Sequence, residues 1–466
     1  MQSLATTRRL PPGPKGLPFI GNLLDFRKDP TGFLTSLARD YGDIAHFRLG
    51  RHHAYQLNHP DYIRDVLVTQ SASFSKTRVL ERARRVIGDG LLSSNGELHR
   101  RQRRLVQPAF QRQRISNYGA IMTAQAVLTS GRWQDGTTVD MFAEMLRLSL
   151  SIVGHTLFGS DIESESEDVR EAMTVVFEYF NQLMLPFAGI IERLPFSNRR
   201  RFEEARALLE RVVYRMIAEH RASGQDHGDL LSMLLLAQDE EGDGGGMSDR
   251  QARDELITMF LAGHETTATT LTWTWYLLAQ HPEVEAELYE ELQSVLGERP
   301  PTVDDLPNLE FTRMILAESM RIYPPVWTLT RRALQDVQIA DYLLPAGSIV
   351  GMSQYVMHHD GRFFPNPERF DPHRWTPTET EKRPKYSYFP FGGGPRHCIG
   401  ESFAWMEATL LLACLSQRWR PQLCSKHEPQ LQPLITLRPQ GGLPMILRRR
   451  STRAAARTTL TATVEC

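Results

Sequence analysis

Apolar residues recur at helical spacing through most of the chain between residues 97 and 322. Two short stretches near the N-terminus, residues 44–49 and 54–57, have the composition typical of strands. A Pro-rich stretch over residues 324–395 follows neither the helical spacing of apolar residues nor the alternation of a strand, and predicts irregular chain. Glycine-rich breaks interrupt the helical part without dividing it, because the apolar pattern resumes after each one. The pattern therefore predicts a mainly α fold in a single large domain, with a small β portion near the N-terminus.

One predicted helix, over residues 248–280, carries the sequence Ala-Gly-His-Glu-Thr-Thr at positions 262–267. Gly263 weakens the helix there, and Thr266 can donate its hydroxyl proton to the carbonyl one turn earlier. We therefore expect the backbone hydrogen bonds of the helix to open into a bulge that admits a water. A carboxylate beside that hydroxyl, here Glu265, can relay protons. Taken alone, the segment fits a glycine chosen for close helix packing equally well.

Residues 391–400 have the sequence Phe-Gly-Gly-Gly-Pro-Arg-His-Cys-Ile-Gly. Cys398 lies just before a predicted helix that begins at Glu401, and Arg396 and His397 precede it directly. Helix N–H dipoles and nearby cations favour the thiolate, which is the form of cysteine that binds iron. The glycines leave room for a flat group close to the backbone. The loop therefore predicts a metal-bound thiolate.

Composition adds little direct information on function. The 466 residues include 54 basic and 55 acidic side chains, a formal net charge of -1, so overall charge gives no reason to expect nucleic acid or an anionic membrane as partner. The four cysteines show no paired framework, which favours a reducing compartment. No apolar run approaches the roughly 20 residues that span a bilayer, and residues 1–10 lack the apolar core of a signal peptide. We therefore expect a cytoplasmic protein with no membrane span.

The cysteine loop matches the pattern Phe-x-x-Gly-x-Arg-x-Cys-x-Gly at every specified position and so resembles the haem-ligand loop of the cytochrome P450 family. The resemblance covers roughly residues 10–447 and implies the family's fold, with haem b between the helix of residues 262–267 and the Cys398 loop. It implies that Cys398 is the axial ligand of the iron and that residues 10–447 form the catalytic domain. We expect residues 1–9 to be flexible and residues 448–466 to form a disordered polar tail.

The same resemblance implies a monooxygenase that inserts one oxygen atom of O₂ into a lipophilic substrate. In the family's acid–alcohol motif, the residue matching Thr266 hydrogen-bonds dioxygen and the residue matching Glu265 supplies protons. Ala262 and Gly263 are expected to be small so that oxygen and substrate fit over the haem, whereas His264 is interpreted as structural. A peroxide-driven peroxygenase and a non-catalytic haem protein remain as alternatives, and the complete acid–alcohol motif argues against both.

Glu318 and Arg321 are one helical turn apart and, by default, would form an ordinary surface pair. Their position before a Pro-rich stretch instead resembles the family's structural Glu-x-x-Arg pair. In that family an arginine further along the chain holds the pair in place. Arg369 and Arg374 are both candidates for that arginine. Arg374 is chosen because its segment matches the pattern Phe-x-Pro-x-Arg.

Two haem propionates need donors when they are buried. By resemblance, His99 and Arg103 on one predicted helix, together with Arg331 and Arg396, are the expected donors, and Arg332 is a close rival of Arg331. An alternative reading of the helix is a solvated basic face. The complete set of residues expected to contact the cofactor is Cys398, His99, Arg103, Arg331, Arg396, Phe391, Ala262, Gly263 and Gly400.

Residues expected by resemblance to line the substrate pocket are mostly apolar: Phe74, Leu183, Phe187, Ile257, Phe260, Leu261, Val326, Trp327, Leu329 and Ile435. A terpenoid or a fatty acid is therefore the expected substrate class. Lys76 or Arg78 could bind a fatty-acid carboxylate, although exposed loop charge is the more ordinary interpretation of both.

No nicotinamide or flavin fingerprint is found in the chain, so electrons from NAD(P)H are expected through a separate reductase and a ferredoxin or flavodoxin. A basic patch is expected to receive that donor, made of Arg100, Arg101, Arg104, Arg112 and Arg114. The protein is expected to act as a monomer.

Overall fold

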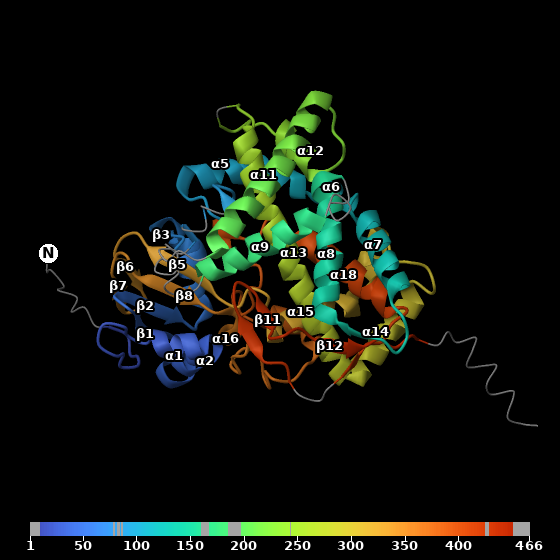
Figure 1. The fold of residues 1–466 in the computed structure, drawn as a ribbon. Coiled ribbons are helices and arrows are strands. Elements are labelled where there is room, and N and C mark those ends of the chain that lie inside the picture. The colour runs from blue at the N-terminus through green and yellow to red at the C-terminus, as the bar shows by residue number, and fades with distance from the viewer. Residues whose placement is uncertain are drawn as a thin grey trace, which may run out of the picture.

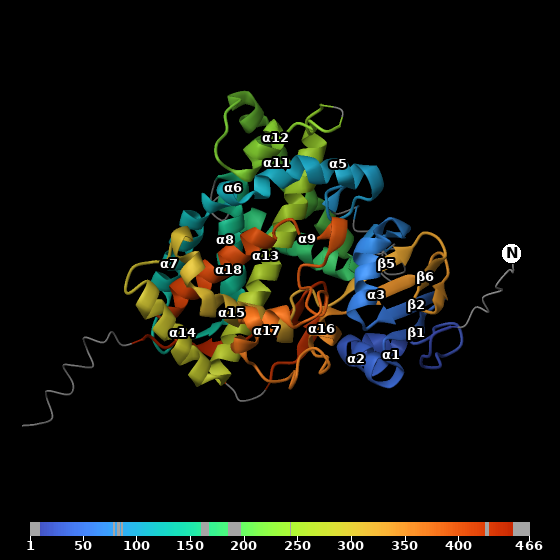
Figure 2. The same ribbon diagram turned by 180° about the vertical axis from the view of Figure 1, so that it is seen from behind.

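The computed structural model describes residues 10–77, 80, 81, 84, 87–159, 167–184, 197–242, 244–424 and 428–450. Figures 1 and 2 show a large helical body with a β-sheet at one side. The mainly α architecture predicted from the sequence is confirmed.

Helices make up most of the described chain. In order they are α1 (Leu23–Lys28), α2 (Pro30–Tyr41), α3 (Pro60–Arg64), α5 (Gly96–Val106), α6 (Arg112–Ser116), α7 (Gly119–Arg132), α8 (Met141–Phe158), α9 (Glu167–Met184), α11 (Ser197–Ser223), α12 (Leu230–Leu236), α13 (Asp249–Gln280), α14 (Pro282–Val295), α15 (Glu310–Ile322), α16 (Gln354–His358), α17 (Pro377–Glu381) and α18 (Glu401–Ser416).

The strands are short. They are β1 (Ile44–Leu49), β2 (His52–Leu57), β3 (Phe74–Ser75), β4 (Thr138–Asp140), β5 (Leu329–Ala333), β6 (Val337–Ile339), β7 (Tyr342–Leu344), β8 (Ile349–Met352), β9 (Gln422–Leu423), β10 (Leu431–Pro433), β11 (Leu437–Pro439) and β12 (Pro444–Ile446).

The largest sheet has the strand order β1-β2-β8-β5-β3, in which β2 and β8 are parallel and the other neighbours are antiparallel. Strands β5 and β8 come from the Pro-rich stretch that the sequence predicted to be irregular, so that prediction is wrong for residues 329–352. Isolated short strands carry little periodicity of their own, and β8 is specified by pairing with the distant β2. The sheet brings Arg331 on β5 to the helical body.

Helix α13 runs through the middle of the helical body and packs against α8, α11, α15 and α18. A capping box begins it, in which Ser248 Oγ accepts from Gln251 N and Gln251 Oε1 accepts from Ser248 N. The sequence placed both ends of this helix correctly. Because it is surrounded on nearly all sides, most of its residues from Ala252 to Leu278 are buried.

Helix α18 follows the cysteine loop and is anchored to α13 through a buried carboxyl group. Glu407 Oε2 accepts a hydrogen bond from Thr267 Oγ1 at 3.0 Å, and burial raises the pKa of Glu407 to about 8. The carboxyl group is therefore mostly protonated at neutral pH, so α18 docks against α13 without a buried charge. This contact fixes the loop that precedes α18 relative to the motif on α13.

The C-terminal tail begins later than predicted. Arg450 donates to the carbonyl of Ser416 and forms an ion pair with Glu285, while Arg449 N donates to Asp135 Oδ1 at 2.7 Å. Residues 448–450 are therefore part of the folded body, contrary to the predicted boundary, because Arg450 pairs with the buried Glu285 and the residues before it bond to neighbouring segments. The tail expected beyond them and the N-terminal residues 1–9 lie outside the described residues.

None of the described helices combines the length and the apolar character that a bilayer crossing requires.

Candidate functional site

Cys398 lies in a tight loop before α18. Its backbone N–H donates to the Phe391 carbonyl at 3.0 Å, and His397 N donates to the Gly394 carbonyl at 3.0 Å. Gly400 is the N-cap residue of α18, so the sulfur is close to the start of that helix, as predicted. Cys398 is an exposed residue, and the protein packed around its thiol nevertheless raises the pKa of that thiol.

Burial raises the pKa of the Cys398 thiol, whereas the Gly400 backbone N–H and the charge of Arg103 oppose that effect. The sequence assigned the favourable charge to Arg396 and His397. Arg396 instead donates to Ser94 O at 2.7 Å, and His397 pairs with Glu401 at 2.5 Å. The cation that acts on the sulfur is thus Arg103, which reaches the loop from α5.

The sequence predicted that all the loop glycines leave room for a flat group, but the structure gives two of them a different role. A Cβ at Gly393 would collide with the ring of Tyr386, and one at Gly394, where φ is +63°, would meet the carbonyl of Leu67. These two glycines permit the loop to pack on its own protein neighbours. A Cβ at Gly400 would be 4.0 Å from Cys398 Sγ, so only this glycine is next to the sulfur among the described loop glycines.

Four of the predicted propionate donors converge beside the loop. Burial lowers the pKa of Arg331 and of Arg396, each to about 10, and for Arg396 the charges of Arg331 and Arg103 add to this effect. Burial and the charges of Arg396 and Arg103, among others, lower the pKa of His99 to about 3, so its imidazole is neutral at neutral pH. We call the three arginines Arg103, Arg331 and Arg396, together with the neutral His99 beside them, the cation cluster; the positive charge belongs to the arginines.

Within the described chain, the members of the cation cluster form no ion pair with an acidic side chain. Arg103 donates to the His397 carbonyl at 2.8 Å and Arg331 to the Thr330 carbonyl at 3.0 Å. Arg396 binds the Ser94 carbonyl and the Asn95 amide oxygen. Such cations repel one another in a low-dielectric interior and require negative charge. Two haem propionates have the right chemistry to supply it, so the residues present fit a haem held beside Cys398.

Lys76 joins this group, which the sequence did not predict. It is buried, and its Nζ donates to the carbonyls of Leu91 and Leu92. Burial and the charges of Arg396 and Arg331 lower its pKa well below the ordinary value. The sequence allowed two interpretations of Lys76: binding of a substrate carboxylate, or an exposed position in a loop. Neither matches this buried location. Arg78 lies outside the described residues.

The structure separates Arg331 from its rival Arg332, although both are on β5. Arg332 Nη2 forms an ion pair with Glu81 at 2.9 Å, on the other side of the strand from Arg331. Alternation along the strand therefore sends one arginine to the cation cluster and the other to an acidic partner.

The segment 262–267 is at the middle of α13. Thr266 Oγ1 donates to the Ala262 carbonyl at 2.8 Å, as predicted, but the helix is continuous there and the expected bulge is absent from α13. Ala262 is exposed, whereas Glu265 is buried. The hydroxyl is thus satisfied by the backbone without opening the helix.

Glu265 has partners that the sequence did not indicate. Its Oε1 accepts a hydrogen bond from Thr436 Oγ1 and lies 3.7 Å from Arg438 Nε. Both partners come from the hairpin of β10 and β11, far along the chain. No motif marks them, because the contact arises from tertiary packing.

Gly263 and His264 both pack α13 against α8. A Cβ at Gly263 would be 3.4 Å from Val153 Cγ2 on α8, and the role of Gly263 in leaving space above the haem stays a prediction. His264 Nε2 lies 3.1 Å from the Leu146 carbonyl, and burial lowers its pKa to about 4. The structural interpretation of His264 agrees with this position.

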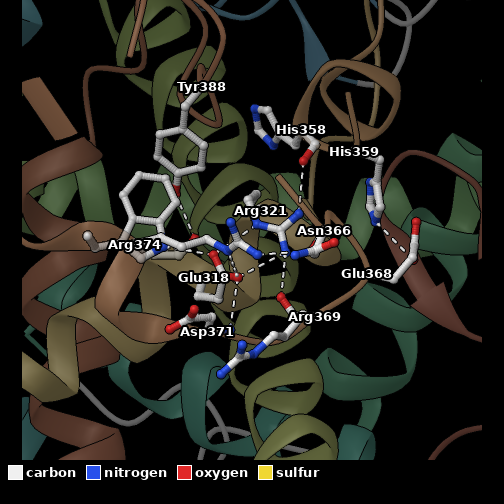
Figure 3. Close-up of polar contacts among 12 residues, drawn as sticks. Glu318, Arg321, His358, His359, Asn366, Glu368, Arg369, Asp371, Arg374 and Tyr388 are labelled. Carbon is white, nitrogen blue, oxygen red and sulfur yellow. Dashed lines mark hydrogen bonds and ion pairs between the residues drawn. The ribbon is translucent and has the colours of Figure 1, made fainter. Parts of the chain in front are cut away.

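Glu318, Arg321 and Arg374 form a buried charge network (Figure 3). Arg321 donates through Nε and Nη2 to both oxygens of Glu318, at 2.8 and 2.9 Å, and neither side chain is exposed. Arg374 Nε lies 3.3 Å from Glu318 Oε1. Arg369, its rival, contributes only its backbone carbonyl, which accepts from Arg321. The geometry therefore favours Arg374 over Arg369.

Only part of the expected substrate pocket is brought together. Ile257, Leu261 and Ile435 belong to one apolar cluster that also includes Ile87 and Leu92; we call these five the apolar cluster. Val326 is half-buried, and Leu329 packs beside the sheet core.

Three further pocket candidates are buried in apolar clusters, and their place in the substrate pocket stays a prediction. Phe74 is in the sheet core, Trp327 packs with residues of α2, and Phe260 is in a cluster that includes residues of α5, α8 and α12. Phe187 and the side chain of Leu183 lie outside the described residues.

The predicted basic patch is largely paired with acids. Arg101 and Arg104 bind the buried Asp239, Arg100 pairs with Glu97, and Arg114 with Asp226. The side chain of Arg112 is not among those described. The patch therefore carries much less excess charge than its sequence indicates.

A cavity of about 440 Å³ opens between α7 and α8, lined by residues such as Gln125, Trp133 and Glu144. None of the candidate site residues lines it.

Comparison with known proteins decides the family. A family profile described as Cytochrome P450 matches residues 11–443.

The chain belongs to the cytochrome P450 family.

Several cytochromes P450 are similar over nearly the whole chain. Cyclooctatin synthase of Streptomyces melanosporofaciens is 39% identical over 92% of this chain and 94% of its own length. Cyclooctat-9-en-7-ol 5-monooxygenase of the same organism is 38% identical over 87% of this chain and 88% of its own length. Pentalenene oxygenase of Streptomyces avermitilis is 39% identical over 87% of this chain and 90% of its own length.

Family membership makes this protein a cytochrome P450 monooxygenase, a haem-iron enzyme that takes up O₂ and receives electrons from redox partners. The fold and the enzyme class predicted from the sequence are thereby confirmed. The individual roles of the site residues remain predictions, now with the geometry described above.

Replacing Arg374 with alanine tests the charge network. We expect a loss of stability on the order of 3 kcal/mol and little haem-loaded protein, because a buried partner of Glu318 is removed. Arg369→Ala is the matched control and should change stability by less than about 0.5 kcal/mol, since only its carbonyl is used. Thermal unfolding and the ratio of haem to protein absorbance measure both. The reverse order of effects would show that Arg369 locks the network.

Replacing Arg331 with methionine tests the cation cluster. We expect haem to dissociate about tenfold faster, because one charge-assisted hydrogen bond to a propionate is lost. Arg332→Met removes the same charge from the neighbouring residue, whose partner is Glu81, and should leave the rate near that of the wild type. Transfer of haem to an excess of an apo-globin measures both rates. Equal rates for the two variants would contradict the assignment of Arg331.

Proposed function

We propose that this cytochrome P450 oxidises a terpenoid, a compact and largely hydrocarbon substrate. The apolar cluster is the observation that carries the proposal: Ile257 and Leu261 are one turn apart on α13, and Ile435 of the C-terminal hairpin packs against the same group of apolar residues. The names of the similar proteins, cyclooctatin synthase and pentalenene oxygenase, support the same class.

A fatty acid is the weaker candidate because the described site offers its carboxylate no suitable cation. Lys76 is directed to the carbonyls of Leu91 and Leu92 and belongs with the cation cluster. A carboxylate buried against the apolar cluster without a partner would cost free energy.

We assign the binding of the cofactor as follows. Cys398 would ligate the haem iron, and the cation cluster with Lys76 would hold the propionates. When bound, the haem supplies oxygen activation and insertion of one oxygen atom into the substrate. Phe391, Ala262 and Gly400 remain predicted cofactor contacts through their places beside the sulfur and on α13.

The protein itself would contribute orientation, water exclusion and proton handling. The apolar cluster would position one carbon of the substrate, because a hydrocarbon gains free energy from contact with Ile257, Leu261 and Ile435. Thr266 presents its hydroxyl oxygen as an acceptor, since its proton is donated to the Ala262 carbonyl. Glu265 would hold and release the proton that oxygen chemistry consumes.

We propose that the electrons come from NAD(P)H through a ferredoxin or flavodoxin and its reductase. The Cys398 loop lies next to Arg103 on α5, and this face would receive the donor. The pairing of four arginines with acids means that docking would depend on a few local charges rather than on a broad basic surface. A monomeric, cytoplasmic protein remains the prediction from sequence.

A matched pair of ligands tests the substrate class. A cyclic terpene hydrocarbon and the carboxylic acid of the same carbon skeleton are titrated into the haem-loaded enzyme, and binding is followed by the change in haem absorption. We expect the acid to bind at least about tenfold more weakly, because burying its unpaired charge would cost about 1.4 kcal/mol or more of binding free energy. A straight-chain fatty acid that binds more tightly than every terpene tested would contradict the proposal.

A further inference from the structure

Glu265 is held by one turn of the C-terminal hairpin, over residues 434–438. Its Oε1 accepts the hydroxyl proton of Thr436, and Arg438 Nε lies 3.7 Å from the same oxygen. Thr436 is buried, with 2% of its surface exposed. Among the described residues, no hydrogen bond reaches Glu265 Oε2. One oxygen of the carboxylate, Oε1, is therefore held by these contacts, whereas Oε2 is not.

The turn that supplies Thr436 is itself rigidly held. Trp273 on α13 donates from Nε1 to the Leu437 carbonyl at 2.7 Å, and Trp327 donates to the Leu434 carbonyl at 2.9 Å. Leu437 N donates to the Pro325 carbonyl at 2.9 Å. Contacts on both sides of Thr436 thus define where its hydroxyl lies relative to α13.

We propose that Thr436 is the positioning residue of the proton relay, and that Arg438 assists it by lying beside the same oxygen of Glu265. The proposal rests on the relay role proposed for Glu265. A glutamate on a helix has several rotatable bonds, and a fixed Oε1 restricts them to conformations that leave Oε2 on one side. Proton transfer depends steeply on such geometry.

The same turn also contacts the proposed substrate site. Ile435, directly before Thr436, packs in the apolar cluster with Ile257 and Leu261. A substrate that fills this region therefore touches the turn that fixes the relay carboxylate. Oxygen chemistry and substrate binding would share one structural element, which favours proton delivery when the substrate is present.

Thr436→Val tests the role of the hydroxyl, because valine keeps the shape and removes the donor. We expect the rate of product formation to fall about fivefold, corresponding to one hydrogen bond of about 1 kcal/mol, and more electrons to be lost to peroxide. Proton transfer should then limit turnover, so the ratio of rates in H₂O and D₂O should rise. Thr436→Ser, which restores the hydroxyl, should restore both the rate and the isotope effect.

Two further variants make the interpretation specific. Thr312→Val removes a similar hydroxyl-to-carboxylate bond, from Thr312 Oγ1 to Glu291 Oε2 at 2.6 Å, far from the site, and controls for lost stability. It should leave the isotope effect unchanged. Glu265→Gln should itself reduce product formation, and adding Thr436→Val to it should cause no further loss, because the hydroxyl acts through the carboxylate.

The outcomes separate the two proposals. If Glu265→Gln leaves product yield and isotope effect unchanged, the relay role of Glu265 is wrong. If Glu265→Gln has its effect but Thr436→Val behaves like Thr312→Val, the relay stands and the positioning role of Thr436 is overturned. Additive losses in the double variant would likewise overturn it, since Thr436 would then act independently of Glu265.

Discussion

Unbalanced positive charge in the interior is the constraint on which the site depends. The cation cluster comes from three distant parts of the chain: His99 and Arg103 from α5, Arg331 from β5 and Arg396 from the cysteine loop. Burial, with the charges of neighbouring arginines added to it, lowers the pKa of His99 and Arg396, and this unfavourable environment opposes folding around them. A haem with two propionates removes this cost and at the same time lies beside Cys398. Cofactor binding and the final arrangement of these segments are therefore coupled.

A neutral or balanced framework surrounds this charged centre. Glu318 satisfies Arg321 and Arg374 in one buried network, and the protonated Glu407 joins α18 to α13 without net charge. Both arrangements fix backbone segments that carry site residues. In these two arrangements charge is balanced or removed within the framework, unlike in the cation cluster.

Contiguous patterns allowed much of this to be predicted from sequence. The boundaries of α13, the location of Cys398 before α18 and the choice of Arg374 over Arg369 all rested on residues close together in the chain. Contacts between distant segments could not be predicted in the same way. The pairing of β8 with β2, the contact of Thr436 with Glu265 and the charge of Arg103 beside Cys398 depend on tertiary packing.

The central claim is that Cys398 binds the iron of a haem held by the cation cluster. Its most direct test is the absorption spectrum of the reduced protein with carbon monoxide, because the position of the main band reports the axial ligand. We predict a strongly red-shifted band in the wild type, which marks a thiolate, and its loss in Cys398→Ala. A wild-type band at the position of histidine-ligated haem, in a preparation that forms product, would contradict the account.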